Sequence, residues 1–302
     1  MEMEAQNKLS LAAKKNSRPP TGREKLMTFN RKVVPGLLMG ITLLVCPLGT
    51  GANAGSVQQE LFQTQNISTV YQSGGQARSE VEQVGSGLQS TIHQEKGVTL
   101  ASVYQTGSKL KSEIYQYGLG GISNQANIRQ DGSGLQASIT EHGMGNVAEI
   151  KQSGGAFSSP QSNSKYRAEI DQFGDLNYSL IEQFGWGQIA SVVQGCETLP
   201  SVGNTAIIRQ LNAMGSQAYI TQMGESNTAS ITQTASNTFG WIDQSGSQNQ
   251  ATLNLNATGA KGGINQKGDS NTANLTMNVA LLLPVTISQV GSNITTNLTI
   301  SK

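Results

Sequence analysis

The chain has 302 residues, of which 36% are hydrophobic, 5% aromatic and 13% charged, and its formal net charge at pH 7 is +1. A typical globular protein is richer in both apolar and charged residues, so an ordinary apolar core is excluded as the main source of stability. Gly, Ser, Thr, Asn and Gln fill the difference, which is typical either of disorder or of a repetitive β structure with amide ladders. No basic patch points to nucleic-acid binding.

The N-terminal region has the features of a secretion signal. An apolar run at residues 33–49 follows the basic pair Arg31 and Lys32, and Ala52 and Ala54 frame an A-x-A cleavage site. The run is too short to span a bilayer comfortably, which favours a cleaved signal over a membrane anchor.

These features divide the chain into four expected parts. They are a stretch upstream of the true initiator Met27 (residues 1–26), a signal peptide (27–54), a short mature N-terminal segment (55–60) and a repeat domain (61–302). Two alternatives stay open, a genuine N-terminal extension and lipidation at Cys46. The first 54 residues hold 8 of the 20 Lys and Arg and 3 of the 19 Asp and Glu, so the mature chain has a net charge of −4. Cys196 is its single cysteine, which excludes an internal disulfide.

From residue 61 onward, Gln recurs at steps of eleven residues. With Gln at position zero, Gly tends to follow at position two, Asn at five, Ala or Ser at seven and Ile or Val at nine, and the unit from Gln222 to Gln233 has every element. A period sustained over this length is typical of a solenoid. The glutamines expected to form its structural ladder are Gln72, Gln83, Gln94, Gln105, Gln116, Gln130, Gln152, Gln172, Gln183, Gln194, Gln210, Gln222, Gln233, Gln244, Gln266 and Gln289.

Within each unit the period is two, as in a β-strand. Positions five, seven, nine and eleven share one face of a strand and keep their character, whereas the other face varies and carries charges such as Glu80. The first face therefore reads as interior and the second as solvent-exposed. Gly at position two suits the positive φ of a tight turn. We predict an all-β, amyloid-like β-solenoid of stacked strand-turn-strand circuits, with about 22 residues in each circuit and about ten circuits.

An inward-facing Gln is costly unless its amide is paired. In a stack of circuits, each Gln can donate to the next one on the same wall, two slots further along the chain, and thirteen such pairs are Gln–Gln. At ~0.2–1 kcal/mol per pair, they contribute roughly 3–13 kcal/mol, comparable with the net stability of a whole domain. Glu141 replaces one Gln within a wall.

Other departures from the repeat lie in expected turns or at the C-terminal end. Extra residues follow slots 116, 152 and 194, and we expect surface insertions there that leave the strands intact. On one wall the last three slots are Leu255, Met277 and Ile300, which indicates an end surface unlike the middle.

The pattern Gln-x-Gly-x-x-Asn-x-Ala-x-x-x-Gln resembles the curlin repeat, and the resemblance covers residues 61–300. It implies a subunit of curli, the extracellular amyloid fibres at the surface of Gram-negative bacteria. It further implies secretion through a dedicated outer-membrane pore, assembly with itself and other curlin subunits, and a role in adhesion to host or matrix surfaces and in biofilm. Whether the chain is the major subunit, the nucleator or an accessory subunit stays open.

No enzyme is expected. His93 is assigned to the solvent face and His142 to a turn, and the scattered carboxylates form no fixed cleft, so we predict no catalytic, cofactor or metal site and no nucleic-acid partner. Two classes of function remain. One is a self-assembling fibre subunit, whose open ends template further rungs. The other is a monomeric surface solenoid, an adhesin that binds a carbohydrate or a host protein through its outer face.

Overall fold

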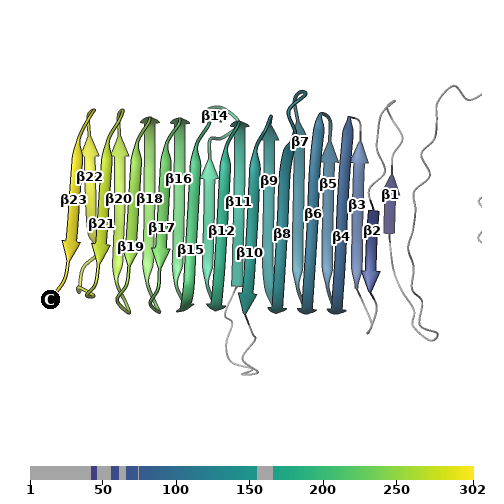
Figure 1. Ribbon diagram of the computed structural model, residues 1–302, viewed down its shortest axis with the longest axis horizontal. Helices are drawn as coiled ribbons and strands as arrows, with labels where there is room; N and C mark the ends of the chain where they lie inside the picture. The colour runs from purple at the N-terminus through teal and green to yellow at the C-terminus, as the bar shows by residue number, and fades with distance from the viewer. Residues whose placement is uncertain (1–41, 46–55, 61–65, 74, 155–165) are drawn as a thin grey trace, which may run out of the picture.

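The computed structural model describes residues 42–45, 56–60, 66–73, 75–154 and 166–302. In this part of the chain the regular secondary structure is β, and all pairs of named strands are parallel. The chain winds through about ten turns of roughly 23 residues, and the turns stack side by side along one axis (Figure 1). The predicted β-solenoid is thereby confirmed.

Alternate strands belong to two sheets, which face each other. Sheet A consists of β1 (Thr42–Val45), β3 (Ile67–Ser73), β5 (Gln89–Glu95), β7 (Lys111–Gly118), β9 (Leu135–Gly143), β11 (Tyr166–Asp175), β13 (Ile189–Gln194), β16 (Gln217–Glu225), β18 (Phe239–Ser247), β20 (Lys261–Lys267) and β22 (Val285–Val290), with β14 (Ser201–Val202) beside β11 and β16. Sheet B consists of β2 (Ser56–Glu60), β4 (Gln76–Ser86), β6 (Val98–Ser108), β8 (Asn124–Ser133), β10 (Val147–Gly154), β12 (Tyr178–Trp186), β15 (Thr205–Met214), β17 (Thr228–Gln233), β19 (Gln250–Leu255), β21 (Thr272–Met277) and β23 (Thr295–Ile300).

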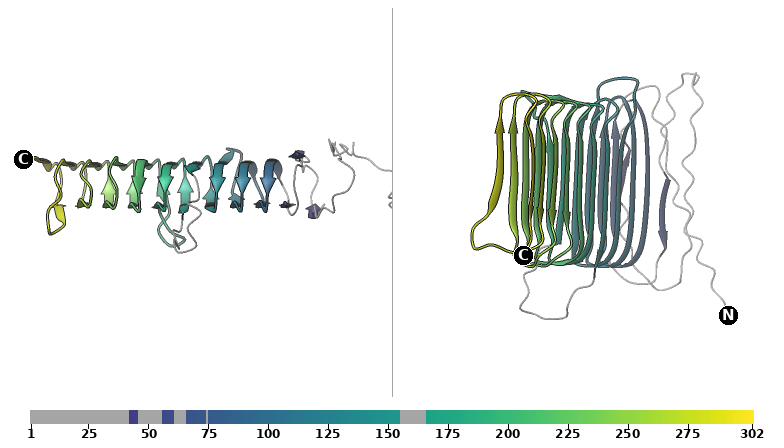
Figure 2. Two further views of the ribbon diagram at one scale, coloured as in Figure 1. Left: turned by 90° about the horizontal axis from the view of Figure 1, so that it is seen from below. Right: turned by 60° about the vertical axis from the view of Figure 1, so that its left-hand side comes forward.

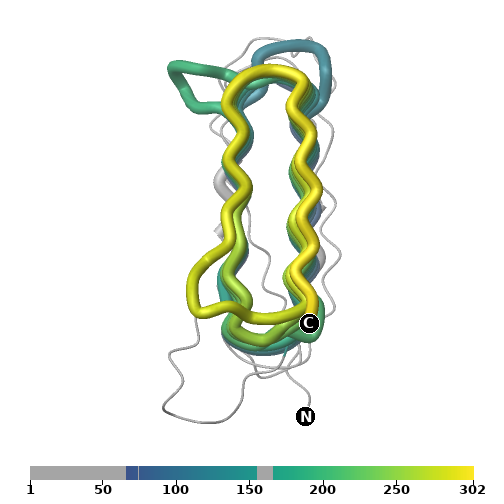
Figure 3. Tube along the Cα trace, turned by 90° about the vertical axis from the view of Figure 1, so that its left-hand side faces the viewer, coloured from purple at the N-terminus to yellow at the C-terminus, as the bar shows by residue number. Residues whose placement is uncertain are grey.

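The two sheets form the long walls of a narrow, flattened coil. Seen along the axis, successive turns superimpose closely along both walls, and a few loops depart from the common outline, among them the yellow loop near the C-terminus (Figure 3). Seen from the side and from an oblique direction, the rungs run parallel and the two walls stay separate along the coil (Figure 2). The interior is therefore a slot that only the inward side chains of the two sheets can fill.

Equivalent residues stack because the register between neighbouring strands keeps the repeat in phase. Ile220 pairs with Ile242 and Gln222 with Gln244 across β16 and β18. Exposure alternates along each strand, as in β3, so that one face is buried and the other meets solvent. The buried aliphatic and alanine side chains form one continuous core from Val70 to Ile287. The period-two prediction for interior and exterior is confirmed by this alternation.

The corner glycines have a role beyond their backbone torsion. Gly107 has a φ of +130°, as a turn of this kind requires, and a Cβ there would lie 1.8 Å from the carbonyl oxygen of Gly132 in the next rung. Gly85 meets Gly107 in the same way. The backbones of successive corners thus approach so closely that only glycine fits, whichever torsion is adopted.

Asparagines satisfy the backbone at one row of corners. Asn227 donates from Nδ2 to the carbonyl of Gly246 at 2.8 Å, and its Oδ1 accepts the backbone N–H of Asn249 at 3.0 Å. The same arrangement recurs in successive turns, which explains the Asn at position five of the repeat. The opposite corners contain a small apolar cluster of Leu88, Leu110, Leu135 and Tyr166.

The insertions leave the strands of both walls in place. Residues 119–123 form a loop between β7 and β8, and the insertion within residues 155–165 lies outside the described residues. The third insertion is more ordered than a plain surface turn. Cys196 and Leu199 form an isolated antiparallel bridge, and β14 then returns to the stack between β11 and β16.

The predicted N-terminal boundaries fall largely outside the described residues, including residues 1–26, Ala52 and Ala54. Two strands are exceptions. β1 (Thr42–Val45) lies within the expected signal peptide and pairs in parallel with β3, and β2 (Ser56–Glu60) lies within the expected mature N-terminal segment and pairs in parallel with β4. The division of the N-terminal region therefore stays a prediction.

Candidate functional site: the inner ladders and the open end

The ladder glutamines are buried on the two inner walls, each at most 2% exposed. Their side chains form thirteen Nε2-to-Oε1 hydrogen bonds of 2.7–2.9 Å, and in each the donor precedes the acceptor along the chain. In sheet A the bonds connect Gln72–Gln94–Gln116, then Gln172–Gln194–Gln222–Gln244–Gln266–Gln289. In sheet B they connect Gln83–Gln105–Gln130–Gln152–Gln183–Gln210–Gln233.

Most ladder glutamines donate their second amide proton across the interior. Gln105 Nε2 also donates to the backbone carbonyl of Gln89 at 3.2 Å, and Gln222 Nε2 to that of Thr205 at 3.0 Å. These acceptors lie at the start of a strand in the opposite sheet. In Gln105 and Gln222 both amide protons and the amide oxygen have partners, so these polar side chains occupy core positions without the cost of an unpaired buried group.

Glu141 interrupts the sheet-A ladder. Its Oε2 accepts from Gln116 Nε2 at 2.6 Å, but its buried Oε1 has no hydrogen-bond partner, and neither has Oε1 of Gln172 in the next rung. Burial raises the pKa of the Glu141 carboxyl from 4.5 to about 8, and the hydrogen bond from Gln116 opposes this only in part.

Toward the C-terminus the sheet-B wall changes from polar to apolar. The ladder ends at Gln233, and Leu255 and Met277 follow, both fully buried. Sheet A compensates with inward glycines, because a Cβ at Gly240 or Gly262 would lie only 3.1–3.2 Å from the leucine or methionine side chains opposite. Larger side chains in sheet B are thus matched by the absence of a side chain in sheet A. This match was not predicted from the sequence, although Gly at position seven, where Ala or Ser is usual, indicates it.

The last turn presents an open surface. Strands β22 and β23 are terminal in their sheets, each with a neighbour on one side. Leu298 in β23 is 38% exposed, whereas its stacked neighbour Leu275 in β21 is fully buried. Three consecutive leucines in the loop before β22, Leu281 to Leu283, are exposed as well.

The outer face of sheet A has a row of neighbouring rings, most of them tilted against each other. The ring centroids of Tyr71, His93, Tyr115, His142 and Phe173 follow one another at 4.4, 4.9, 5.5 and 4.8 Å across five rungs. The assignment of His142 to a turn is wrong, because this residue lies within β9 and its ring stacks on that of Phe173. Burial against these rings lowers its pKa below the usual value. The row was missed because its members alternate in residue type.

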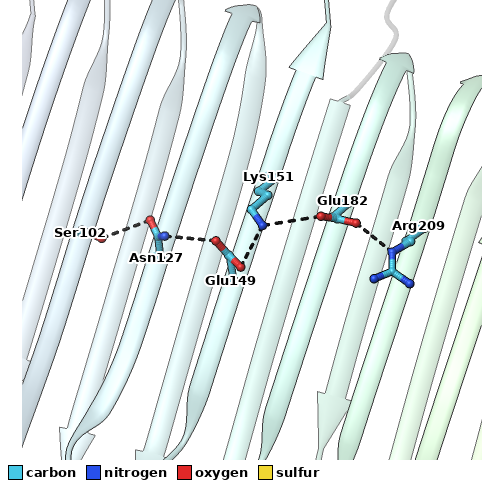
Figure 4. A network of polar contacts seen from close by, with 6 residues as sticks. All are labelled: Ser102, Asn127, Glu149, Lys151, Glu182 and Arg209. Carbon is cyan, nitrogen blue, oxygen red and sulfur yellow. Dashed lines mark hydrogen bonds and ion pairs between the residues drawn. The ribbon is translucent and has the colours of Figure 1, made fainter.

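A polar row crosses the outer face of sheet B (Figure 4). Asn127 Nδ2 donates to Glu149 at 3.3 Å, Lys151 contacts Glu149 at 3.1 Å and Glu182 at 3.6 Å, and Arg209 Nε donates to Glu182 at 2.9 Å. Lys151 and Arg209 thus each contact a carboxylate, although the register also places Lys151 beside Arg129 of β8.

No protein-family model and no curated protein matches the chain. Within residues 66–73, 75–154 and 166–302, His, Cys, Asp and Glu form no group of three or more that could hold a metal ion. Over the part of the chain that the structure describes, no helix is long and apolar enough to cross a membrane. The arrangement offers stacking surfaces, and the open C-terminal rung is the candidate assembly site.

Proposed function

We propose that the chain is a secreted structural subunit of curli-type extracellular amyloid fibres, which grow when one solenoid stacks on the end of another. The observation that carries the proposal is the exposure of Leu298, a core position of the last rung, beside the unpaired outer edge of β23. Exposed strand edges with apolar side chains are templates for further strands.

The internal register suggests how two copies join. In the stack, Gln266 in β20 pairs with Gln289 in β22, and Gln289 Nε2 donates within its own turn to Thr296 Oγ1 at 3.0 Å. A following copy that offers β3 to β22 would place its Gln72 in the next slot of the same wall. The ladder would then run from one molecule to the next with the hydrogen bonds already used within each.

This junction requires the edge of β3 to be free. Strand β1 (Thr42–Val45) occupies that edge in the chain as described, and it belongs to the segment expected to be removed as a signal peptide. The proposal therefore places assembly after cleavage, outside the cell. As for curli subunits, it includes export through an outer-membrane pore of a Gram-negative bacterium, other curlin subunits as partners, and adhesion and biofilm as the purpose. No catalytic activity is part of it.

A second candidate is a surface adhesin that acts as a monomer. The row of half-buried rings from Tyr71 to Phe173 favours it, since aromatic rings on the outer face of a rigid sheet can bind sugar rings or a host protein. The row is also explained by cross-strand packing that stabilises the sheet. The open end favours the fibre subunit.

The test compares purified residues 55–302 with residues 27–302, which retain β1. The shorter chain is expected to form dye-binding fibrils with a ~4.8 Å cross-β reflection, and the longer chain to form them more slowly. Exposed strand edges associate at concentrations on the order of tens of micromolar. If the shorter chain stays monomeric for days at such a concentration, the fibre proposal is overturned and the adhesin proposal remains.

A further inference from the structure

The interruption at Glu141 is confined to one junction of the sheet-A ladder. Glu141 and Gln172 are register partners on β9 and β11, both fully buried, and each has one oxygen without a hydrogen-bond partner. Elsewhere in the ladder, the Oε1 of a glutamine accepts from the preceding rung on the same wall, as that of Gln194 does from Gln172. The unpartnered Oε1 of Gln172 therefore belongs to the side facing Glu141.

The amide of Gln172 is fixed in this orientation. Its two amide protons point to three acceptors within hydrogen-bond distance of Nε2, which are Gln194 Oε1 at 2.9 Å, Ser179 Oγ at 3.0 Å and the carbonyl of Val147 at 3.3 Å. A flipped amide would direct Nε2 toward Glu141, but it would turn an oxygen toward the Gln194 oxygen and lose these three contacts. The flip would only move the defect by one rung.

The opposite wall provides no donor either. In the turn that follows, Ser179 Oγ crosses the interior and donates to Gln194 Oε1 at 2.8 Å. The register equivalents of Ser179 in the two preceding turns are Ala148 and Ala126, which have no hydroxyl. Neither of the two unpartnered oxygens can therefore receive a hydrogen bond from sheet B.

We propose that Glu141 is protonated in the folded solenoid and donates from Oε1 to Oε1 of Gln172, which closes the sheet-A ladder and makes this junction a pH-sensitive joint. A carboxylic acid has the shape of a glutamine amide and offers one donor and one acceptor, which are the two functions that the slot needs. The proton is taken up from water when a chain with ionised Glu141 folds. An ionised carboxylate would instead place a negative charge opposite an amide oxygen in a dry interior.

On the described strands around Glu141, no inward charge would stabilise the ionised form. Strands β7, β8, β10 and β11 pack around β9. Besides Glu141, the inward ionisable residue of these strands is Tyr166, which pairs with Leu135 at the other end of β11 from Gln172. The remaining titratable and charged side chains of these strands are on their outward faces. They are Lys111, Glu113, Tyr115 and Tyr117 of β7, Arg129 and Asp131 of β8, His142 of β9 itself, Glu149 and Lys151 of β10, and Arg167, Glu169, Asp171 and Asp175 of β11.

Protonation of Glu141 links the stability of the fold to pH, and stability is expected to fall as the pH rises. Burial raises the pKa of Glu141 to about 8 in the folded chain, above the 4.5 of an unfolded one. The folded state therefore binds more protons between these values, and stability falls as pH rises through them. One proton of difference changes the unfolding equilibrium up to about tenfold per pH unit.

The experiment measures denaturant unfolding of the full mature chain from pH 5 to pH 9, with Glu141→Gln as the test variant and Glu80→Gln, an exposed outward carboxyl, as the control. Wild type and Glu80→Gln are expected to lose stability steadily from pH 5 to about pH 8. Glu141→Gln is expected to lack this component and to exceed wild type at pH 9.

Infrared spectroscopy of the wild-type chain provides an independent measurement that needs no variant to fold. A buried carboxylic-acid C=O stretch is expected at pH 6, lost with a midpoint near pH 8 and absent from Glu141→Gln. A carboxylate signal alone at pH 6, or identical pH profiles for wild type and Glu141→Gln, would overturn the proposal. The outcome does not depend on fibre formation, since the joint lies within one molecule.

Discussion

Glu141 and Gln172 face each other across neighbouring rungs with one unpartnered oxygen each, in a ladder whose other described junctions are closed by amide hydrogen bonds. The contrast shows which hydrogen-bonding groups a ladder position in the polar interior requires. Each slot requires a side chain that both accepts from the preceding rung and donates to the following one. Glutamine meets this requirement at any pH, whereas glutamic acid meets it only when protonated.

Replacement of Gln222 by Ala is expected to destabilise the solenoid by roughly 2–6 kcal/mol, because it leaves the amide of Gln194 and the oxygen of Gln244 unpaired and opens a cavity. Denaturant unfolding measures the change. Thr221→Ala, on the outward face of the same strand, serves as control and should cost under about 1 kcal/mol. Equal costs for the two variants would refute the energetic importance of the inner ladder.

Replacement of Gly107 by Ala is expected to cost more than about 3 kcal/mol, since the new Cβ would lie 1.8 Å from the carbonyl oxygen of Gly132 and the stack would have to open. Gly134→Ala is the matched comparison. Gly134 also has a positive φ, of +71°, but no atom lies within 4 Å of a Cβ there. Its substitution should cost only the torsional term of about 1–2 kcal/mol. Similar thermal stabilities would mean that torsion alone selects these glycines.

Substitution of Glu182 by Gln is expected to change stability by at most about 1 kcal/mol, although Glu182 links Lys151 and Arg209 in the outer row. The pairs are partly exposed to water, and the amide can still accept from Arg209. The difference from wild type should shrink further at ~1 M salt. A loss as large as that of Gln222→Ala would show that the outer row stabilises the stack as strongly as the inner ladders do.

Replacement of Leu298 by Lys is expected to slow fibre growth at least about tenfold while changing the stability of a single solenoid little, because Leu298 is 38% exposed in one molecule and becomes buried only when another rung covers it. Seeded growth followed by dye fluorescence measures the rate. Leu119→Lys, in the exposed loop between β7 and β8 and far from β23, is the control. Growth of the two variants at one rate would exclude β23 as a growing edge.

The sequence alone determined the architecture, since its eleven-residue spacing assigned the ladder glutamines to two walls and predicted their thirteen pairs. Such inference works because the repeat is local and period two on a strand separates interior from exterior without knowledge of distant contacts. It also located Glu141 as a departure, but not what that departure does. The aromatic row on sheet A and the strand β14 within an insertion could not be predicted, because they arise from neighbours 22 or more residues apart.

Only the tertiary structure decided which roles the repeated residues perform. The sequence explained Gly107 by its torsion, and the stack added the carbonyl of Gly132 in the space of a side chain. The sequence presented Leu255 as a change of surface, and the stack revealed the inward Gly240 that makes room for it. In both instances the constraint comes from atoms of another rung, whose distance and direction are set by the register between strands and by no pattern within one unit.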